Sequence, residues 1–534
     1  MIGFVQFISG KHVGAETGGL FTTVAAPLMS REKGMYTIGY DIGSTSVKGV
    51  ILDLEAGKPI AHSAAPIGEM PIAAPRLGWA EQHPRMWWEN LKTVTHNLLA
   101  LSQIPPVRVA GIGIAYQMHG LVLVDAAHHA LRPSIMWCDS RAGDIGKRAF
   151  DSLGHDRCLH SLLNSPGNFT ASKLCWIREN EPATYEQVFK AMLPGDYIAM
   201  RLTGEISTTV PGLSEAILWD YQKRRPAKFL LEEFAINPDM IPQTVRSFGK
   251  EGGLSNRAAQ ELGLPTGIPI TYRAGDQPNN AFSLNVLRDG EAAATAGSSG
   301  VVFAVSETMR CDRESRVNTF AHVNHSKENT NLGILLCING TAIASNWVKR
   351  VLTGGFFGFE RGNRSIEDVP VGSGGLVLLP FGNGAERMLG GRDLGAHLIH
   401  LNHNIHSDAH LARAVLEGVA FAFKYGMEIM AELEMRPAVM RAALSNLFLS
   451  DVFCTAFVNA TGIPLELYQT DGAQGAATGA GVGLGYYPSI DDALASLECK
   501  ERIDPDPSLA DAHAAAYDRW LRALMNIEEL QREA

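Results

Sequence analysis

The stretch that decides the fold runs from Tyr36 to Asp53 and reads YTIGYDIGSTSVKGVILD. Two apolar runs rich in β-branched residues flank a small polar segment, GSTS at positions 43–46. Apolar runs that meet at such a segment are typical of a β-hairpin. The first predicted strand ends in a carboxylate, Asp41, which we therefore expect beside the turn.

The same pattern returns in the second half of the chain. Residues 291–305 read EAAATAGSSGVVFAV, which is again a strand, a small polar turn (GSSG, 297–300) and a strand. A repeat at long spacing indicates two related halves. Because the second hairpin has no carboxylate where the first has Asp41, we expect similar folds with different chemical roles.

Strand and helix patterns alternate along both halves, which predicts an α/β fold. The predicted strands cover residues 109–115, 121–124, 268–274, 333–338 and 375–380. The predicted helices cover residues 86–101, 173–180, 186–192, 279–287, 407–432 and 511–532. The Gly- and Ala-rich segment 471–485 contains small residues spaced for close packing, and we interpret it as a tightly packed soluble helix rather than a membrane dimerisation helix.

Composition excludes several classes of function. The chain of 534 residues carries a formal net charge of −10, so it has no general attraction for nucleic acid or anionic lipid. No apolar run approaches the ~18 residues that a membrane span needs. The seven cysteines form no CxxC pair, which favours reduced thiols in a cytoplasmic protein over disulfides or a thiolate metal site. A homodimer is compatible with these features.

The first residues do not resemble the rest of the chain. Residues 3–8 are apolar, but they are too few for a signal peptide and a basic residue follows them. We expect residues 1–34 to be a disordered N-terminal extension, which a start codon assigned upstream of the true one would explain.

The two polar turns suit phosphate binding. Segment 43–46 offers unhindered backbone N–H groups and three hydroxyls beside Asp41, as a polyphosphate held with a divalent cation requires. An ordinary hairpin turn is the alternative. The matching segment 297–300 favours the phosphate interpretation, because two such turns would hold both ends of a triphosphate. Neither segment is a Walker motif.

Candidate acid–base and sugar-binding residues stand at strand ends. Asp276 follows Gly275 at the end of a predicted strand, where a carboxylate can take a proton from a hydroxyl. Alternatively, Asp276 is the N-cap of the next predicted helix. His119 can bind a polyol, although a lone histidine is more often structural. Tryptophans near polar groups suit a sugar pocket or the rim of a core; they are Trp79, Trp87, Trp88 and Trp137.

These residues, read in order, resemble the FGGY carbohydrate kinases, and the xylulokinase branch of that family in particular. The similar segments are 41–48, 78–84 with 87–88, 117–120, 137–141, 169–177, 275–277 and 297–300. The resemblance implies an α/β fold of two ribonuclease-H-like domains of the actin and hexokinase type, with the active site in the cleft between them. It implies an N-terminal domain over 35–287, for sugar and catalytic base, and a nucleotide-binding C-terminal domain over 288–534.

The implied activity is ATP-dependent phosphorylation of D-xylulose to D-xylulose 5-phosphate with Mg²⁺. Asp276 would be the base that deprotonates the C5 hydroxyl, and Asp41 would act with it in catalysis and in metal binding. The residues implied to contact the sugar are Gln117, Met118, His119, Trp137, Asp276 and Gln277. Those implied to contact the nucleotide are Gly43, Ser44, Thr45, Ser46, Lys48, Gly297, Ser298, Ser299, Gly384 and Asn446.

The chain departs from the family pattern in two places. The glycine spacing of the second family signature is lost around residues 396–400, and the usually glycine-rich adenosine motif reads RAALSN at 441–446. We expect Ala442 and Ala443 to crowd the nucleotide. Three alternatives stay open: a kinase for another pentulose, polyol or sugar acid; a sugar-binding regulator with weakened catalysis; and an actin-like ATPase without a sugar substrate.

Overall fold

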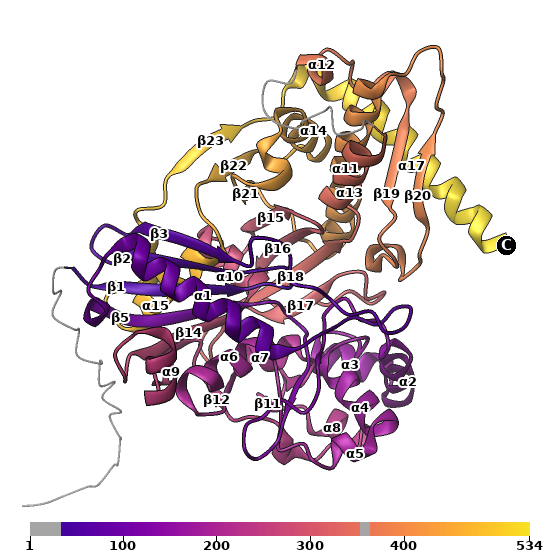
Figure 1. The fold of residues 1–534 in the computed structure, drawn as a ribbon. Helices are drawn as coiled ribbons and strands as arrows, with labels where there is room; N and C mark the ends of the chain where they lie inside the picture. Colours follow the sequence, from indigo (N-terminus) through magenta and orange to yellow (C-terminus); the bar gives the residue numbers. More distant parts are fainter. Residues whose placement is uncertain (1–33, 353–363, 534) are drawn as a thin grey trace, which may run out of the picture.

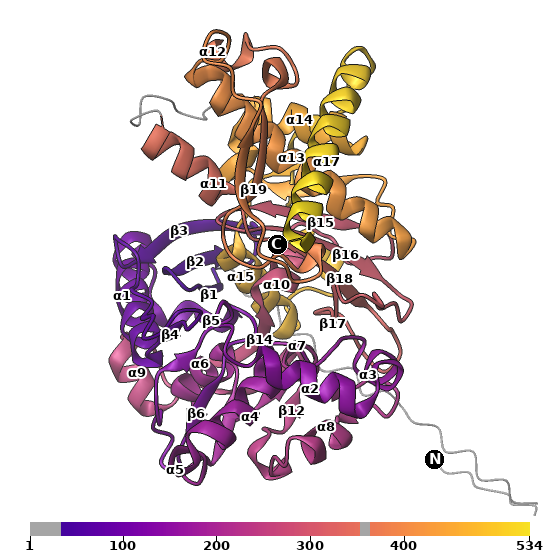
Figure 2. The ribbon, with the colours of Figure 1, turned by 90° about the vertical axis from the view of Figure 1, so that its right-hand side faces the viewer.

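The computed structural model describes residues 34–352 and 364–533. The expectation of a disordered extension over 1–34 falls, except for Gly34, outside the described residues. Two lobes are visible, with the N-terminal half forming most of the lower lobe and the C-terminal half most of the upper one (Figures 1 and 2). Each lobe is built around one large sheet.

The first sheet has six strands in the order β13-β14-β5-β1-β2-β3. Its centre is parallel, since β5 pairs in parallel with both β1 and β14, and the outer pairs are antiparallel. The strands are β1 (Tyr36–Ile42), β2 (Val47–Asp53), β3 (Lys58–Ala65), β5 (Val109–Tyr116), β13 (Phe248–Gly253) and β14 (Pro269–Gly275). The predicted hairpin is therefore confirmed as β1 and β2, which pair from Tyr36 with Asp53 to Ile42 with Val47.

The second sheet repeats this arrangement with one added edge strand, in the order β17-β18-β16-β15-β21-β22-β23. From β18 to β23 the parallel and antiparallel pairings match those from β3 to β13. The strands are β15 (Ala292–Ala296), β16 (Gly300–Ser306), β17 (Asn318–Ala321), β18 (Leu332–Ile338), β21 (Met440–Ala443), β22 (Leu465–Tyr468) and β23 (Cys499–Ile503). The two related halves predicted from the repeated hairpin are confirmed.

Helices cover both faces of the first sheet. Alternation along β1 directs Tyr40 to one face, where its hydroxyl bonds Thr95 of α1 (Pro84–Ser102) at 2.7 Å. Thr37 points to the other face and donates to the carbonyl oxygen of Ala477 in α15 (Gly472–Gly483) at 2.8 Å. Both faces of the sheet are therefore buried, as is typical of parallel strands.

Helix α15 comes from the C-terminal half of the chain but packs on β1, β5 and β14 of the first sheet (Figures 1 and 2). Glycines make this approach possible: a Cβ atom on Gly39 would lie 2.1 Å from the carbonyl oxygen of Ala473, and one on Gly113 would lie 2.0 Å from that of Ala476. The close packing predicted for this segment is confirmed, and it ties the last part of the chain to the first sheet.

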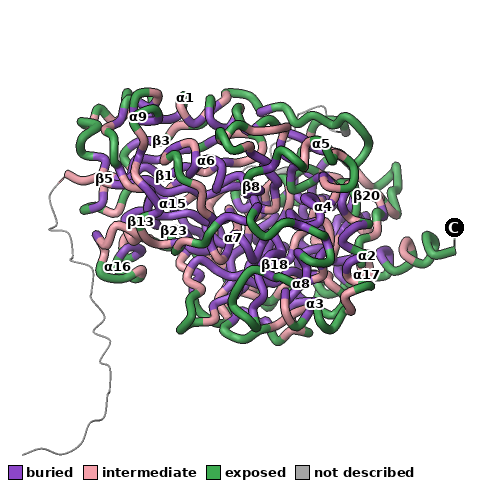
Figure 3. The backbone as a smooth tube through the Cα atoms, turned by 90° about the horizontal axis from the view of Figure 1, so that it is seen from below, coloured by how far each residue is buried: buried purple, intermediate pink, exposed green. Residues whose placement is uncertain are grey.

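The remaining helices flank the sheets. In the lower lobe they are α2 (Gly143–Leu153), α3 (His155–Leu162), α4 (Thr170–Asn180), α5 (Pro182–Tyr185), α6 (Pro194–Thr203), α7 (Val210–Glu215), α8 (Lys228–Glu233) and α9 (Asn256–Leu262). In the upper lobe they include α13 (Asp408–Glu432), α14 (Asp451–Thr461) and α17 (Ala510–Glu533), whose exposed end projects from the molecule (Figure 3). No helix in the described ranges is long and apolar enough to cross a membrane.

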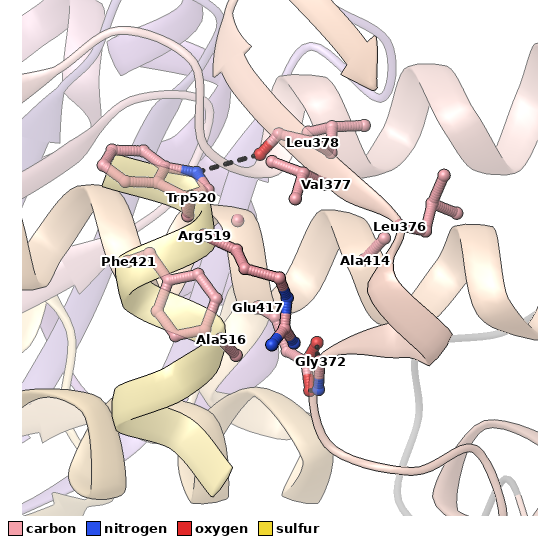
Figure 4. A pocket seen from close by; sticks show the side chains of 11 residues that line it. Gly372, Leu376, Val377, Leu378, Ala414, Glu417, Phe421, Ala516, Arg519 and Trp520 are labelled. Carbon is pink, nitrogen blue, oxygen red and sulfur yellow. Dashed lines mark hydrogen bonds between the residues drawn. The ribbon is translucent and has the colours of Figure 1, made fainter. Parts of the chain in front are cut away.

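A narrow pocket in the upper lobe lies between α13, α17 and β19 (Val377–Phe381) (Figure 4). The indole N–H of Trp520 donates to the carbonyl oxygen of Leu378 at 3.0 Å. The carboxylate of Glu417 accepts from Ser373 Oγ at 2.9 Å and from Arg413 Nε at 2.8 Å. These polar groups already have hydrogen-bond partners within the protein. We therefore interpret the pocket as a packing gap between the helices and not as a ligand site.

One predicted helix is wrong. Residues 186–192 do not form a helix, because α5 ends at Tyr185 and β8 (Lys190–Met192) pairs antiparallel with β6 (Val122–Val124). The helical spacing of apolar residues in this short segment is overridden by pairing with a distant strand. The helix expected over 279–287 is displaced, since α10 runs from Asp276 to Ser283.

Candidate active site

The candidate active site lies where the three parallel strands of the first sheet end. Ile42 of β1, Tyr116 of β5 and Gly275 of β14 stand in register across these strands. The residues that follow them are the turn 43–46, Gln117 to His119, and Asp276. Ligands of open α/β sheets bind at the carboxyl ends of parallel strands. The fold thus brings most of the predicted catalytic and sugar-contacting residues to one sheet edge.

Asp276 is the first residue of α10, with Gly275 as the N-cap, so the N-cap alternative for Asp276 is not what the structure has. Burial and the charge of Asp41 raise the pKa of Asp276 to about 7, against the opposing hydrogen bonds from Gln277. Gly275 has no room for a side chain, since a Cβ there would lie 2.6 Å from Met118 Cγ. The carboxyl group is therefore held at a helix N-terminus with a pKa near neutrality.

Asp41 lies near the end of β1, opposite Lys48 of β2. Burial raises its pKa, which the charge of Lys48 lowers and that of Asp471 raises further. The N-terminus of α15 abuts it: a Cβ on Gly472 would lie 2.7 Å from Asp41 Oδ2. Asp41 thus connects the first sheet to the helix that crosses from the other half of the chain.

Two carboxylates that repel each other suit a divalent cation. Asp41 raises the pKa of Asp276, so a cation between them would relieve the repulsion. Within the described ranges no group of three or more His, Cys, Asp or Glu residues could hold a metal by itself. Mg²⁺ is typically bound by one or two carboxylates together with substrate phosphates. The residues present therefore fit Mg²⁺ that is shared with a nucleotide.

The first polar turn is fixed by hydrogen bonds to its backbone. Gly43 N donates to the carbonyl oxygen of Ser46 at 3.0 Å, and Gln82 Nε2 donates to that of Ser44 at 2.9 Å. Met70 N donates to the carbonyl oxygen of Thr45 at 2.7 Å. The shape of the turn is thus set before any ligand binds.

His119 has a left-handed backbone, with φ of 61°, which costs energy for a residue other than glycine. The backbone N–H of His119 donates to Glu215 Oε2 at 2.9 Å, and its ring Nδ1 lies 3.0 Å from the carbonyl oxygen of Glu215. Burial, with the charge of Lys173, lowers the pKa of His119 to about 3. The ring is therefore neutral, with the proton on Nδ1 and Nε2 left as an acceptor.

Lys173 ties His119 to the segment of Trp137. Its fully buried ammonium group donates to the carbonyl oxygen of His119 at 3.0 Å and to that of Met136 at 2.7 Å. Trp137 is 37% exposed. Lys173 therefore anchors the segment of this partly exposed indole to the segment of His119.

Of the other three candidate tryptophans, Trp87 and Trp88 belong to the protein core and Trp79 is partly exposed. Trp87 and Trp88 are at most 1% exposed, and their indole N–H groups bond Gln82 Oε1 and Glu261 Oε2. Trp79 stacks on the guanidinium of Arg141, 3.7 Å from the ring centroid. Trp87 and Trp88 therefore fit the core alternative, and their polar neighbours are structural partners.

The second polar turn is held by residues of the upper lobe. Thr341 Oγ1 donates to the carbonyl oxygens of Gly297 at 2.7 Å and Ser298 at 3.1 Å. A Cβ on Gly297 would lie 3.7 Å from Asn446 Nδ2, so Asn446 is a neighbour of this turn. Gly384 has a φ of 84° and is exposed. Among the described residues no hydrogen bond or ion pair joins this turn to the first one, and each turn lies in the corresponding hairpin of its own sheet.

The expected crowding of the nucleotide is wrong for Ala442, whose methyl group is fully buried in the core of the upper lobe. Alternation along β21 places Ala443 on the other face, where it is partly exposed. The alanine that replaces the usual glycine at position 442 therefore contributes its methyl group to the core of the upper lobe.

The sequence patterns did not identify two further residues that lie near the site. Glu215, at the end of α7, is 2% exposed, and burial raises its pKa well above the ordinary value. A Cβ on Gly275 would lie 3.3 Å from Glu215 Oε1, so this carboxyl group lies behind both His119 and the start of α10. Arg387, from the upper lobe, stands over the ring of Phe169 at 5.1 Å. Glu215 is far from the other site residues in the sequence, whereas Arg387 lies three residues after Gly384.

Comparison with known proteins agrees with this geometry. Residues 36–283 match the N-terminal domain of the FGGY family of carbohydrate kinases. The xylulose kinase of Klebsiella pneumoniae is 29% identical over 449 residues, which are 83% of this chain and 88% of the relative. That of Lactococcus lactis is 27% identical over 93% of this chain and 98% of its own length.

Solved structures give the same result over most of the chain. The xylulose kinase of Rhodospirillum rubrum superposes with a TM-score of 0.80 at 26% identity, covering 93% of this chain and 99% of the other. The xylulose kinase of Brucella ovis superposes with a TM-score of 0.81 at 26% identity, covering 93% of this chain and 100% of the other. The predicted fold of two actin-like domains is confirmed. Residues 36–283 thus carry the N-terminal domain of the FGGY family of carbohydrate kinases, and most of the chain is similar to xylulose kinases.

Proposed function

We propose that this protein transfers the γ-phosphoryl group of ATP to D-xylulose and forms D-xylulose 5-phosphate. The observation that carries the proposal is Asp276, a carboxyl group at the end of β14 whose pKa is raised to about 7. A base with that pKa is deprotonated in a large fraction of molecules at neutral pH and still accepts a proton. Similarity to xylulose kinases supports the choice of sugar.

In the proposed reaction the C5 hydroxyl oxygen of the sugar forms a bond to the γ-phosphorus. The bond from that phosphorus to the bridging oxygen breaks, and its electron pair leaves with ADP. The hydroxyl proton passes to a carboxylate oxygen of Asp276. Phosphoryl transfer needs mainly positioning and charge stabilisation, which agrees with a site that holds no covalent nucleophile in these roles.

The sugar would be bound by the edge formed by Gln117, Met118, His119, Trp137 and Gln277. The neutral ring of His119 offers Nε2 as an acceptor for a sugar hydroxyl. Gln117 is 3% exposed, and its Oε1 has no hydrogen-bond partner among the described residues. A buried acceptor without a partner is costly, so a sugar hydroxyl that donates to it would contribute affinity.

The nucleotide would be held between the turns 43–46 and 297–300, with Lys48, Gly384 and Asn446. We assign residues 35–287 to the sugar-binding domain and 288–534 to the nucleotide-binding domain, although α15 of the latter packs on the first sheet. Asp41 and Asp276 would bind Mg²⁺ together with the phosphates. When bound, Mg²⁺ neutralises charge on the β- and γ-phosphate oxygens.

The reaction as proposed takes place in the cytoplasm, in agreement with seven cysteines that are all free thiols. All the proposed site residues come from one chain, so a monomer or a homodimer would carry complete sites. Light scattering on the purified protein measures which of the two forms.

A coupled assay of ADP release tests the substrate. Purified protein is given ATP and Mg²⁺ with xylulose, ribulose, gluconate, glycerol or fuculose in turn, and with no sugar. We expect the highest kcat/KM for xylulose and negligible ADP release without sugar. A higher kcat/KM for another sugar would replace the substrate, sugar-independent turnover would indicate an ATPase, and sugar binding without ATP binding in calorimetry would indicate a regulator.

A further inference from the structure

Arg387 of the upper lobe is a partly buried cation without a counter-ion. It begins a short 3-10 helix, Arg387–Leu389, and its guanidinium makes no ion pair or hydrogen bond with any residue in the described ranges. The most deeply buried arginines of these ranges all face carboxylates. Examples are Arg141 with Asp139 and Glu81, Arg273 with Asp196 and Glu251, and Arg413 with Glu417.

An unpaired buried charge is costly, and proteins avoid it unless a ligand supplies the partner. Burial lowers the pKa of Arg387, which agrees with a desolvated position. Arginine stays charged in such positions and offers a planar set of donors that suits phosphate or carboxylate oxygens. The side chain therefore stands ready to bind an anion.

The surroundings indicate which anion. On one side, Arg387 lies 5.1 Å above the ring of Phe169, and that ring is 4.9 Å from the ring of His119. The charge of Arg387 contributes to the lowered pKa of His119. Arg387 thus reaches from the upper lobe to the edge where the sugar is proposed to bind.

On the other side, the neighbouring residue Glu386 connects Arg387 to the second polar turn. The carboxylate of Glu386 accepts from Asn339 N at 2.9 and 3.0 Å and from the backbone of Gly340. The next residue, Thr341, holds the carbonyl oxygens of Gly297 and Ser298. The backbone at Arg387 is therefore connected through Glu386 to the segment that holds this turn, while its guanidinium lies over Phe169 near His119.

We infer that Arg387 binds the phosphoryl group as it passes from ATP to the sugar. This inference rests on the proposed function. The guanidinium donates hydrogen bonds to the non-bridging oxygens of the group, whose charge is spread over these oxygens in the transition state. Because Arg387 comes from the upper lobe and reaches Phe169 of the lower lobe, we expect the contact to form when both substrates are bound.

The test compares Arg387→Met, Arg387→Lys and a control, Arg313→Met, which removes an exposed arginine of the same half of the chain. We expect Arg387→Met to lower kcat by about 10²- to 10³-fold, as for the loss of one donor to a transition state. The KM values for xylulose and ATP should change only a few-fold. Arg387→Lys should recover part of kcat, and Arg313→Met should match the wild type.

A binding readout separates this role from a structural one. The wild type should bind ADP and aluminium fluoride tightly in the presence of xylulose, and Arg387→Met should lose that tight complex while binding xylulose alone normally. Wild-type kcat in Arg387→Met would overturn the inference. So would a loss confined to the KM for xylulose, or a loss seen only with gluconate, which would make Arg387 a carboxylate-binding residue.

The two proposals fail in different ways. A wild type that phosphorylates no sugar ends the proposed function and this inference with it, whereas an active wild type with an unimpaired Arg387→Met ends the inference alone. If Arg387→Met does not fold, as judged by circular dichroism and thermal melting, Arg387→Lys decides through the same kcat and aluminium fluoride measurements. A Lys variant equal to the wild type in both would then overturn the role of the guanidinium.

Discussion

Lys173 and His119 are joined by a hydrogen bond of 3.0 Å from the lysine Nζ to the histidine carbonyl oxygen. The same ammonium group donates to the carbonyl oxygen of Met136 at 2.7 Å. One buried cation therefore sets the relative position of the two segments proposed to contact the sugar. The Phe169–Ile177 stretch that contains Lys173 was recognised from the sequence as a family motif, and the structure supplies a physical reason for its lysine.

We predict that Lys173→Met raises the KM for the sugar roughly tenfold, about 1.4 kcal/mol, because His119 and Trp137 lose their common anchor. Two buried carbonyl groups lose their donor, so the free energy of unfolding should fall by about 2–5 kcal/mol. Steady-state kinetics and urea unfolding measure both effects. The control is Lys147→Met, which removes an exposed lysine of α2; equal KM values in the two variants would contradict the anchoring role.

The same lysine predicts a pH effect. Burial lowers the pKa of Lys173 to about 8, so the ammonium is charged below pH 8 and loses its proton above it. Its hydrogen bonds to His119 and Met136 then weaken, and the KM for the sugar should rise above pH 8 in the wild type. Lys173→Met should have a high KM that no longer changes through this range. A wild-type KM that is flat from pH 7 to 9.5 would refute this.

We predict that Asp276→Asn lowers kcat by at least about 10²- to 10⁴-fold, the contribution of a general base, with little change in sugar affinity. In the wild type, kcat should fall as the pH drops below about 7, because a base must be deprotonated and burial raises the pKa of Asp276 to about 7. Rapid-quench kinetics measure the chemical step. Near-normal turnover in this variant would remove Asp276 from the base role.

Asp276 also makes stability depend on pH. Its pKa is higher in the folded protein, about 7, than the ordinary 3.8, so the folded state holds the proton more tightly. This contribution to stability is present below pH 4 and is lost as the pH rises through 7. Without Mg²⁺, Asp276→Asn should therefore be more stable than the wild type at pH 8, by at most about 4 kcal/mol, and the difference should shrink toward pH 4. Urea unfolding at both pH values measures it.

After burial, the charge of Asp41 raises the pKa of Asp276 further, and we predict that Asp41→Asn moves the acid limb of the kcat profile to lower pH. The reason is the loss of the negative charge that raises the pKa of Asp276. The variant should also need about tenfold more Mg²⁺ for half-maximal rate, since one of two proposed oxygen ligands becomes neutral. An unchanged acid limb together with an unchanged Mg²⁺ dependence would mean that the two carboxyl groups do not act together.

The docking of α15 gives a prediction about stability. Gly39→Ala places a methyl group 2.1 Å from the carbonyl oxygen of Ala473, so α15 must shift away from β1. We expect the free energy of unfolding to fall by about 1–3 kcal/mol, and kcat to fall too, because Gly472 at the start of α15 abuts Asp41. Gly68→Ala is the control, since a Cβ there meets nothing within 4 Å. Equal melting temperatures for the two variants would contradict this account.

Local patterns were enough to predict the framework of the protein. The hairpin from Tyr36 to Asp53 and its repeat at 291–305 indicated two related halves, because strand periodicity and small polar turns are properties of neighbouring residues. Asp41 and Asp276 could be chosen as candidate catalytic residues for the same reason, since each stands where an apolar strand ends. The segment 186–192 was assigned wrongly because its strand exists only through pairing with β6.

The arrangement of the site was decided by contacts between residues far apart in the sequence. Glu215 lies behind His119, Lys173 joins His119 to Met136, and Arg387 reaches Phe169 from the other lobe. The raised pKa of Asp276 likewise depends on burial and on Asp41, which the folded chain alone brings near it. The sequence by itself determined the strands, the turns and the candidate carboxylates, because these follow from local periodicity. The tertiary structure decided their charge states, their partners and the position of Arg387, because desolvation and long-range packing exist only in the folded molecule.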